Sequence, residues 1–109
     1  MTEEKVTHRF YVAGVKFHEL HTVINDISEG ETLLIDPEPT NKYDPNAIRL
    51  IYDNFSKRAM IGYVPKRFSS EVSALIELEH NLQCVVSKLT PGAKPWEQIE
   101  VEIREIDEQ

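Results

Sequence analysis

Six short segments with strand composition constrain the fold of this chain more than any other feature of its sequence. They cover residues 8–15, 31–36, 47–52, 59–64, 82–89 and 98–106. The segments are rich in β-branched and aromatic residues, or they alternate apolar with polar positions, as half-buried strands do. Pro37 and Pro39 remove two backbone donors after the second segment, and Pro65 ends the fourth. In the last segment, Glu100 and Glu102 are expected to face water.

Two helices are expected between these strands. Within residues 19–27 the apolar side chains recur at spacings of three, one and three, which is typical of one face of a helix, and Gly30 follows as a stop signal. Ser69 or Ser70 can cap a second helix that runs to about Glu79. Its apolar positions, spaced for burial, are Val72, Leu75, Ile76 and Leu78. The polar segment 53–58 suits a hairpin between the third and fourth strands.

Six strands with two inserted helices predict an α+β, mainly β fold, built as a small, strongly bent six-stranded barrel. A length of 109 residues fits one domain, 1–109, with a core over about residues 6–106. No apolar run approaches the ~20 residues that a membrane helix requires, and the acidic start of the chain does not resemble a secretory signal. We therefore expect a cytoplasmic location and no membrane partner. Cys84 lies in an apolar run and is expected to be a buried thiol.

The charge of the chain is distributed unevenly. The net charge of −7 argues at first against nucleic acid, because phosphate binding rests on lysine and arginine. Residues 39–70, however, contain six lysines and arginines against two aspartates, a net charge of +4. The rest of the chain therefore carries −11, the difference between −7 and +4. The basic residues either share a solvated face or mark a surface for nucleic acid.

The basic segment contains two motifs, DPEPTNKYDPNAI at residues 36–48 and IGYVPK at residues 61–66. An aromatic such as Tyr43 can stack on a base whatever the identity of that base. The Asp44 carboxylate is a poor partner for phosphate but a good acceptor for a terminal sugar hydroxyl. Lys66 and Arg67 add charge at the expected start of a helix, where anions bind well. This combination favours the end of a nucleic-acid strand over its interior.

Together with FYVAGV at residues 10–15, these motifs resemble the HIRAN domain family over nearly the whole chain. The family occurs alone in bacteria and phages, and it is fused to DNA-remodelling translocases in eukaryotes. The resemblance implies a small barrel related to SH3-like and OB-like barrels. It also implies a non-catalytic module without cofactors that grips the free 3′-hydroxyl end of single-stranded DNA. A protein partner in DNA processing is a further expectation.

The resemblance maps the DNA-contacting positions directly onto Asn41, Tyr43, Asp44, Asn46 and Lys66. Three assignments are less direct. Tyr63 stands where a relative can carry an imidazole, Phe17 or His18 is the candidate for an aromatic after the first strand, and Trp96 is the candidate for a second base-stacking residue. Arg67, with Lys42 and Arg58, would extend the path along the backbone of the strand.

Other interpretations of the same residues remain open at this point. Asn41, Asp44 and Asn46 could serve as turn residues that bind their own backbone, and Tyr43 could cap the core. Asp36, Glu38 and Asp44 could form a carboxylate cluster for a cation, so a metal-dependent nuclease is a minor alternative.

A zinc enzyme and a peptide-binding module are two other classes of protein to compare with this sequence. A zinc enzyme finds little support, because only His18 and His21 could share a helix face. The main rival is a barrel that binds peptides. Convergence of Lys42, Arg58, Lys66 and Arg67 around Tyr43 would favour nucleic acid over that rival.

Overall fold

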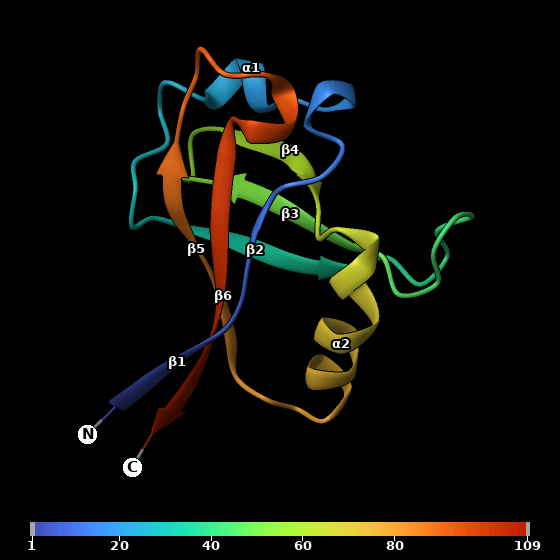
Figure 1. Cartoon of the computed structure of the whole chain (residues 1–109). Helices are drawn as coiled ribbons and strands as arrows, with labels where there is room; N and C mark the ends of the chain where they lie inside the picture. Colours follow the sequence, from blue (N-terminus) through green and yellow to red (C-terminus); the bar gives the residue numbers. More distant parts are fainter. Residues whose placement is uncertain (1, 109) are drawn as a thin grey trace.

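A single antiparallel sheet of six strands organises the chain, as the computed structural model of residues 2–108 shows (Figure 1). The strands are β1 (Thr2–Tyr11), β2 (Thr32–Pro37), β3 (Ile48–Asp53), β4 (Arg58–Tyr63), β5 (Leu82–Leu89) and β6 (Ile99–Glu108). Their order across the sheet is β1-β6-β5-β2-β3-β4, and every neighbouring pair is antiparallel. The six predicted strands and the α+β, mainly β class are thus confirmed.

The sheet bends sharply at β2. Thr32 and Leu33 pair with β5, whereas the residues from Leu34 onward pair with β3. This bend brings the segment after β1 back to β4, where Ala13 and Tyr63 exchange two backbone hydrogen bonds of 2.9 Å. The two edges meet at this bridge without a continuous ladder, so the predicted small, bent barrel is present in a loose form that the sheet does not fully close.

Gly62 permits this meeting of the two edges. A Cβ atom at position 62 would lie 2.3 Å from the Ala13 carbonyl oxygen and 2.7 Å from a Val12 methyl group. No side chain fits at that separation, so the glycine is required for close backbone approach rather than for an unusual dihedral angle.

The first strand begins six residues earlier than predicted. β1 pairs with β6 from Thr2 onward, with an irregularity between Val6 and His8. The polar start of the chain had no strand pattern of its own, and its partner lies about a hundred residues away in sequence. Pairing with β6 therefore decides its conformation, and the two strands form a two-stranded ribbon (Figure 1).

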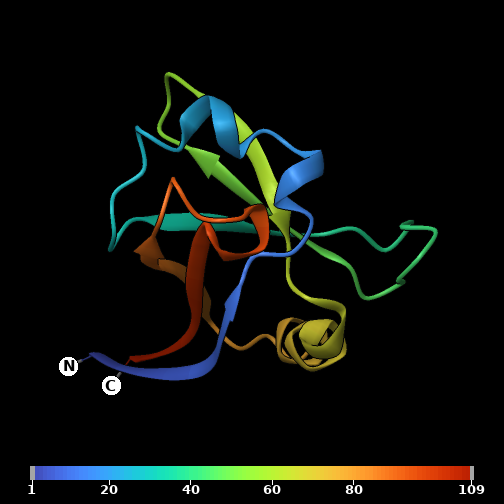
Figure 2. The ribbon, with the colours of Figure 1, turned by 45° about the horizontal axis from the view of Figure 1, so that its top comes forward.

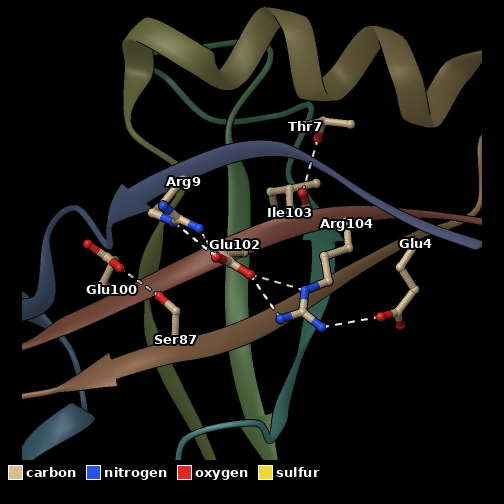
Figure 3. Close-up of polar contacts among 8 residues, drawn as sticks. All are labelled: Glu4, Thr7, Arg9, Ser87, Glu100, Glu102, Ile103 and Arg104. Atoms are coloured by element: carbon tan, nitrogen blue, oxygen red, sulfur yellow. Dashed lines mark hydrogen bonds and ion pairs between the residues drawn. The ribbon is translucent and has the colours of Figure 1, made fainter.

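A charged network covers the outer face of this ribbon (Figure 3). The Glu102 carboxylate accepts hydrogen bonds from Arg9 Nε at 2.9 Å and from Arg104 at 2.9 and 3.1 Å, and Arg104 also pairs with Glu4 at 3.4 Å. The hydrogen bonds from Arg9 and then Arg104 lower the pKa of Glu102. Glu102 is 6% exposed, so the expectation that it faces water was wrong. Ser87 donates to Glu100 at 2.9 Å on the same face.

The predicted helix over residues 19–27 is shortened to one helical turn, α1 (Leu20–Val23). A 3₁₀ turn, η1 (Val15–Phe17), precedes it. The apolar stripe was nevertheless identified correctly, since Leu20, Val23 and Ile27 are buried. The chain leaves the helix because Asp26 is held by β3 and the hairpin: its carbonyl accepts from Tyr52 Oη at 3.3 Å and its carboxylate from Lys57 at 2.8 Å.

The second helix, α2 (Lys66–Glu77), begins three residues before the predicted cap. Pro65 occupies the position before the first turn, and among residues 2–108 no side chain caps the helix. Ser69 therefore lies inside the helix and is 1% exposed. Val72 is fully buried, and Leu75 and Ile76 are half-buried. The burial predicted for Leu78 was wrong, because it lies at the end of the helix and is 71% exposed.

The core lies between the two halves of the bent sheet, beneath α1 and α2. Cys84 belongs to it with no exposed surface, and burial raises the pKa of its thiol, as expected for an inert cysteine. A second 3₁₀ turn, η2 (Pro95–Glu97), follows β5. In the part of the chain that the structure describes, no helix is long and apolar enough to cross a membrane.

Candidate nucleic-acid interface

A hollow of about 270 Å³ lies where the two edges of the sheet meet. Its walls come from the segment after β1, the loop of residues 38–47, the end of β4 and the first residue of α2. The lining residues are Ala13, Gly14, Asn41, Tyr43, Asp44, Ala47, Tyr63, Val64 and Lys66. Figure 2 shows the 38–47 loop projecting from the sheet on the side where α2 begins. Folding thus brings the two sequence motifs together at one site.

Asn41 folds the loop. Its Oδ1 accepts hydrogen bonds from the backbone N–H groups of Tyr43 at 2.8 Å and Asp44 at 3.0 Å, and its Nδ2 donates to Glu38 at 2.7 Å. Asn41 therefore acts as the turn residue that the alternative interpretation described. Asn46 differs, because only its backbone N–H is engaged; its side chain forms no hydrogen bond to any residue within 2–108.

Asp44 is anchored through both carboxylate oxygens. Oδ1 accepts from the Asn46 N–H at 2.8 Å, and Oδ2 accepts from the Ser69 hydroxyl at 2.6 Å. These bonds, first that of Ser69 and then that of Asn46, lower the pKa of Asp44, and the Lys66 charge adds to the effect. The carboxylate is therefore ionised at neutral pH. Each oxygen retains a lone pair that can accept a further hydroxyl.

The sequence interpretation missed Ser69 as part of the site. A serine just before an apolar helical stripe suggests a helix cap, and no local pattern relates it to an aspartate 25 residues earlier. Only the position of α2 against the loop makes the contact. Ser69 is the residue that fixes Asp44 to the body of the protein.

Tyr43 extends away from the core at the rim of the hollow. Its side chain is 86% exposed, so the interpretation of Tyr43 as a cap on the core was wrong. Lys66 Nζ lies 3.4 Å from the Tyr43 carbonyl oxygen, which fixes the backbone while the ring stays free. The ring is available for stacking next to an ionised carboxylate.

Tyr63 uses its hydroxyl inside the protein. The Oη atom donates to Glu38 at 3.0 Å, and burial, followed by this carboxylate, raises the pKa of Tyr63. Glu38 also forms an ion pair with Arg49 at 3.4 Å. Glu38 therefore connects the loop to β3 and β4 through its contacts with Asn41, Arg49 and Tyr63. Of the two candidates after the first strand, His18 contacts this wall, with its ring 5.5 Å from the Tyr63 ring in an edge-on arrangement.

The positive charges around the hollow are fewer than expected. Lys42 and Lys66 are exposed on the segments that frame the hollow, and Arg67 adjoins Lys66 with its guanidinium 4.7 Å from the Phe68 ring. None of the three pairs with a carboxylate within residues 2–108. Arg58 lies at the opposite end of β4 and pairs with Asp53 at 3.0 Å, so its expected place along the path was wrong.

Phe17 and Trp96 form a second aromatic area beside the hollow. The 3₁₀ turns that carry them, η1 and η2, are in contact, and the two side chains are 78% and 61% exposed. Each ring lies near a lysine, Lys16 at 5.8 Å and Lys94 at 5.5 Å. Neither ring lines the hollow, but η1 follows directly after Gly14, which does.

The carboxylates do not converge for metal binding. Within the described residues, no three histidine, cysteine, aspartate or glutamate side chains come close enough to hold an ion. Asp36 and Glu38 bind Arg49, whereas Asp44 faces Ser69.

Comparison with known proteins identifies relatives of the fold and of the sequence. A crystal structure of a protein from Lactobacillus plantarum has a TM-score of 0.77 at 18% identity, over 99% of this chain and 100% of the other. The crystal structure of the HIRAN domain of human HLTF has a TM-score of 0.72 at 15% identity, over 99% of this chain and 81% of the HLTF chain.

The rice Fanconi-associated nuclease 1 homolog (Oryza sativa subsp. japonica) is 27% identical over 73 residues. These cover 67% of this chain and 7% of the rice protein, so the chain spans only a small part of that relative.

The HIRAN domain family model matches residues 5–104. HIRAN domains are in general DNA-binding modules, and in family terms they are non-catalytic. The match covers most of the chain, agrees with the fold of the HLTF domain and includes both motifs of the hollow. The chain therefore belongs to the HIRAN domain family.

Proposed function

We propose that this chain binds the end of single-stranded DNA that carries a free 3′-hydroxyl, in the hollow beside Tyr43 and Asp44. The observation that carries the proposal is the pairing of a free aromatic ring with an anchored, ionised carboxylate at the rim of one hollow. Membership of a DNA-binding family supports the class of ligand. A partner in DNA processing fits the larger nuclease relative and is part of the same proposal.

Each side chain has a distinct role in this proposal. Tyr43 stacks on the terminal base, a contact worth about 1 to 3 kcal/mol that does not depend on base identity. Asp44 accepts a hydrogen bond from the terminal sugar hydroxyl. A 3′-phosphate would instead place negative charge against the carboxylate, so Asp44 selects for the hydroxyl end by repulsion as well as by attraction.

Lys66 supplies charge to the phosphate preceding the end, together with Lys42 and Arg67. Three free cations on a domain of net charge −7 give a modest, salt-sensitive contribution. Phe17 and Trp96 lie beside the hollow and can stack further bases of a longer strand. Asn46, with its free side-chain amide, can contact the sugar or phosphate.

The test is a fluorescence-anisotropy titration with short single strands that end in a 3′-hydroxyl or a 3′-phosphate. We expect the wild-type protein to prefer the hydroxyl end, Asp44→Asn to lose that preference, and Tyr43→Ala to bind both strands about 5- to 150-fold more weakly. Lys66→Ala should weaken binding at low salt. Arg58→Ala, which removes a paired cation at the far end of β4, is the matched control and should bind as the wild type does.

Circular dichroism of each variant establishes that the fold is retained. Equal binding of both strand ends by the wild type, or binding that Tyr43→Ala and Asp44→Asn leave unchanged, would refute the proposal. Binding of an unrelated peptide library without binding of any strand would favour the peptide-binding alternative.

A further inference from the structure

The tip of the β3–β4 hairpin presents an aromatic side chain that the fold does not require. Phe55 is fully exposed, and its φ of +74° places it in the left-handed region. Glycine or asparagine adopts this conformation at lower cost than a bulky residue does. The polar tip predicted for this hairpin therefore carries one apolar exception, and neither burial nor turn geometry explains it.

Hydrogen bonds hold this tip in a defined shape. The Phe55 N–H donates to Asp53 Oδ1 at 2.9 Å, and Asn54 Oδ1 accepts from the N–H groups of Ser56 at 3.1 Å and Lys57 at 2.7 Å. Asn54 Nδ2 also donates to the Tyr52 hydroxyl at 3.2 Å. The ring is therefore presented on a fixed support, as a residue that inserts into a partner would be.

The charges around the tip argue against a phosphate partner. Lys57 pairs with Asp26 at 2.8 Å and Arg58 with Asp53 at 3.0 Å, so both cations are neutralised. Glu19, which accepts from the Met60 N–H at 3.2 Å, is exposed next to them. The end of the molecule that carries Phe55 is thus neutral to acidic and suits an apolar pocket with a basic rim.

The chain has such a pocket at its other end. The hollow of about 270 Å³ has apolar walls that include Ala13, Ala47 and Val64, and a cavity of roughly 150 Å³ is known to hold benzene. Lys66 lines this hollow and Lys42 is exposed on the loop that frames it, so these two lysines together with the ionised Asp44 leave a net positive charge at the rim. Figures 1 and 2 both show the β3–β4 connection and the 38–47 loop at opposite ends of β3.

We propose that Phe55 of one copy inserts into the hollow of a second copy, so that copies of this chain associate head to tail. The acidic end then meets the basic rim, which gives the contact its direction. At physiological salt, the repulsion between two chains of net charge −7 is screened beyond about 8 Å. Because a single ring anchors the contact, the association is weak, with a dissociation constant of about 0.1–1 mM.

The test is sedimentation equilibrium of the full chain over rising concentration, without nucleic acid, so it does not depend on the proposed DNA binding. We expect the average mass to rise above the 12.6 kDa of one chain. Phe55→Asn should keep the hairpin, since asparagine tolerates the left-handed region, and should weaken association at least about tenfold. Leu78→Ser, which removes another exposed apolar side chain, is the matched control and should associate as the wild type does.

A mixing experiment tests the direction of the contact. Ala47→Phe fills the hollow but keeps the Phe55 ring, whereas Phe55→Asn keeps the hollow. Each variant alone should stay monomeric, and an equimolar mixture should form a 1:1 heterodimer that cannot grow further. Lys66→Glu, at an exposed position, replaces Ala47→Phe if the latter fails to fold. A wild type that stays monomeric to about 1 mM, a Phe55→Asn variant that associates normally, or a mixture that stays monomeric would each overturn the proposal.

Discussion

The bond between Ser69 and Asp44 gives the sharpest prediction about this site. Ser69 is 1% exposed, and its hydroxyl lies 2.6 Å from Asp44 Oδ2, so Ser69→Ala deletes a charge-assisted hydrogen bond between α2 and the loop. Such bonds contribute about 1.5–3 kcal/mol. Because Asp44 remains partly exposed to water, we expect a loss of about 1–2 kcal/mol in the free energy of unfolding at pH 7.

The loss should depend on pH in a defined direction. The folded protein lowers the pKa of Asp44, so this carboxylate contributes stability that is fully present above its ordinary pKa of 3.8 and is lost as the pH falls through the lowered value. Ser69→Ala moves the pKa of Asp44 back toward its ordinary range. The difference in stability between the two proteins should therefore shrink at pH values below about 4.

Urea denaturation of both proteins at pH 7 and at pH 3, with an NMR titration of Asp44, measures the two effects. Ser70→Ala, an exposed neighbour in the same helix, is the control and should change stability by less than about 0.5 kcal/mol. A stability loss that is the same at both pH values, or an unchanged pKa of Asp44 in Ser69→Ala, would refute the argument that this bond anchors the charged carboxylate.

Three further predictions concern the fold. Gly62→Ala should lower the free energy of unfolding, measured by urea denaturation, by about 1–3 kcal/mol, because the new Cβ would meet the Ala13 carbonyl oxygen at 2.3 Å. A variant with the stability of the wild type would show that the two edges need not approach so closely. Glu102→Gln should lower the free energy of unfolding by about 1–2 kcal/mol at neutral pH. This loss should become smaller as the pH falls below about 4.5, since the pKa of Glu102 is lowered in the folded protein. A loss of stability that does not depend on pH would contradict this prediction. Val72→Ala should lower the free energy of unfolding by about 2 kcal/mol, and Leu78→Ala by less than about 0.5 kcal/mol, because only Val72 is buried. Thermal unfolding of the two variants measures this difference. The reverse order of stability would contradict the burial observed for α2.

The strands were predictable from sequence because their pattern is local. Alternation and turn residues located β2 to β5 within a residue or two, and the apolar stripe identified Leu20, Val23 and Ile27 as buried. The extent of the helix that contains this stripe was not predictable, since Asp26 is held by residues far along the chain. The start of β1 was likewise decided by β6, because a polar strand takes its conformation from its partner.

The site divides in the same way. The sequence by itself determined that Tyr43, Asp44 and Lys66 stand in motifs of a DNA-binding family, and that the basic charge is concentrated near them. Only the tertiary structure decided that the Asp44 carboxylate accepts a hydrogen bond from Ser69 and that Arg58 lies at the end of β4 away from the hollow. The physical reason is that residue type limits what a side chain can do, whereas contacts across 25 residues depend on how the sheet bends and where α2 packs.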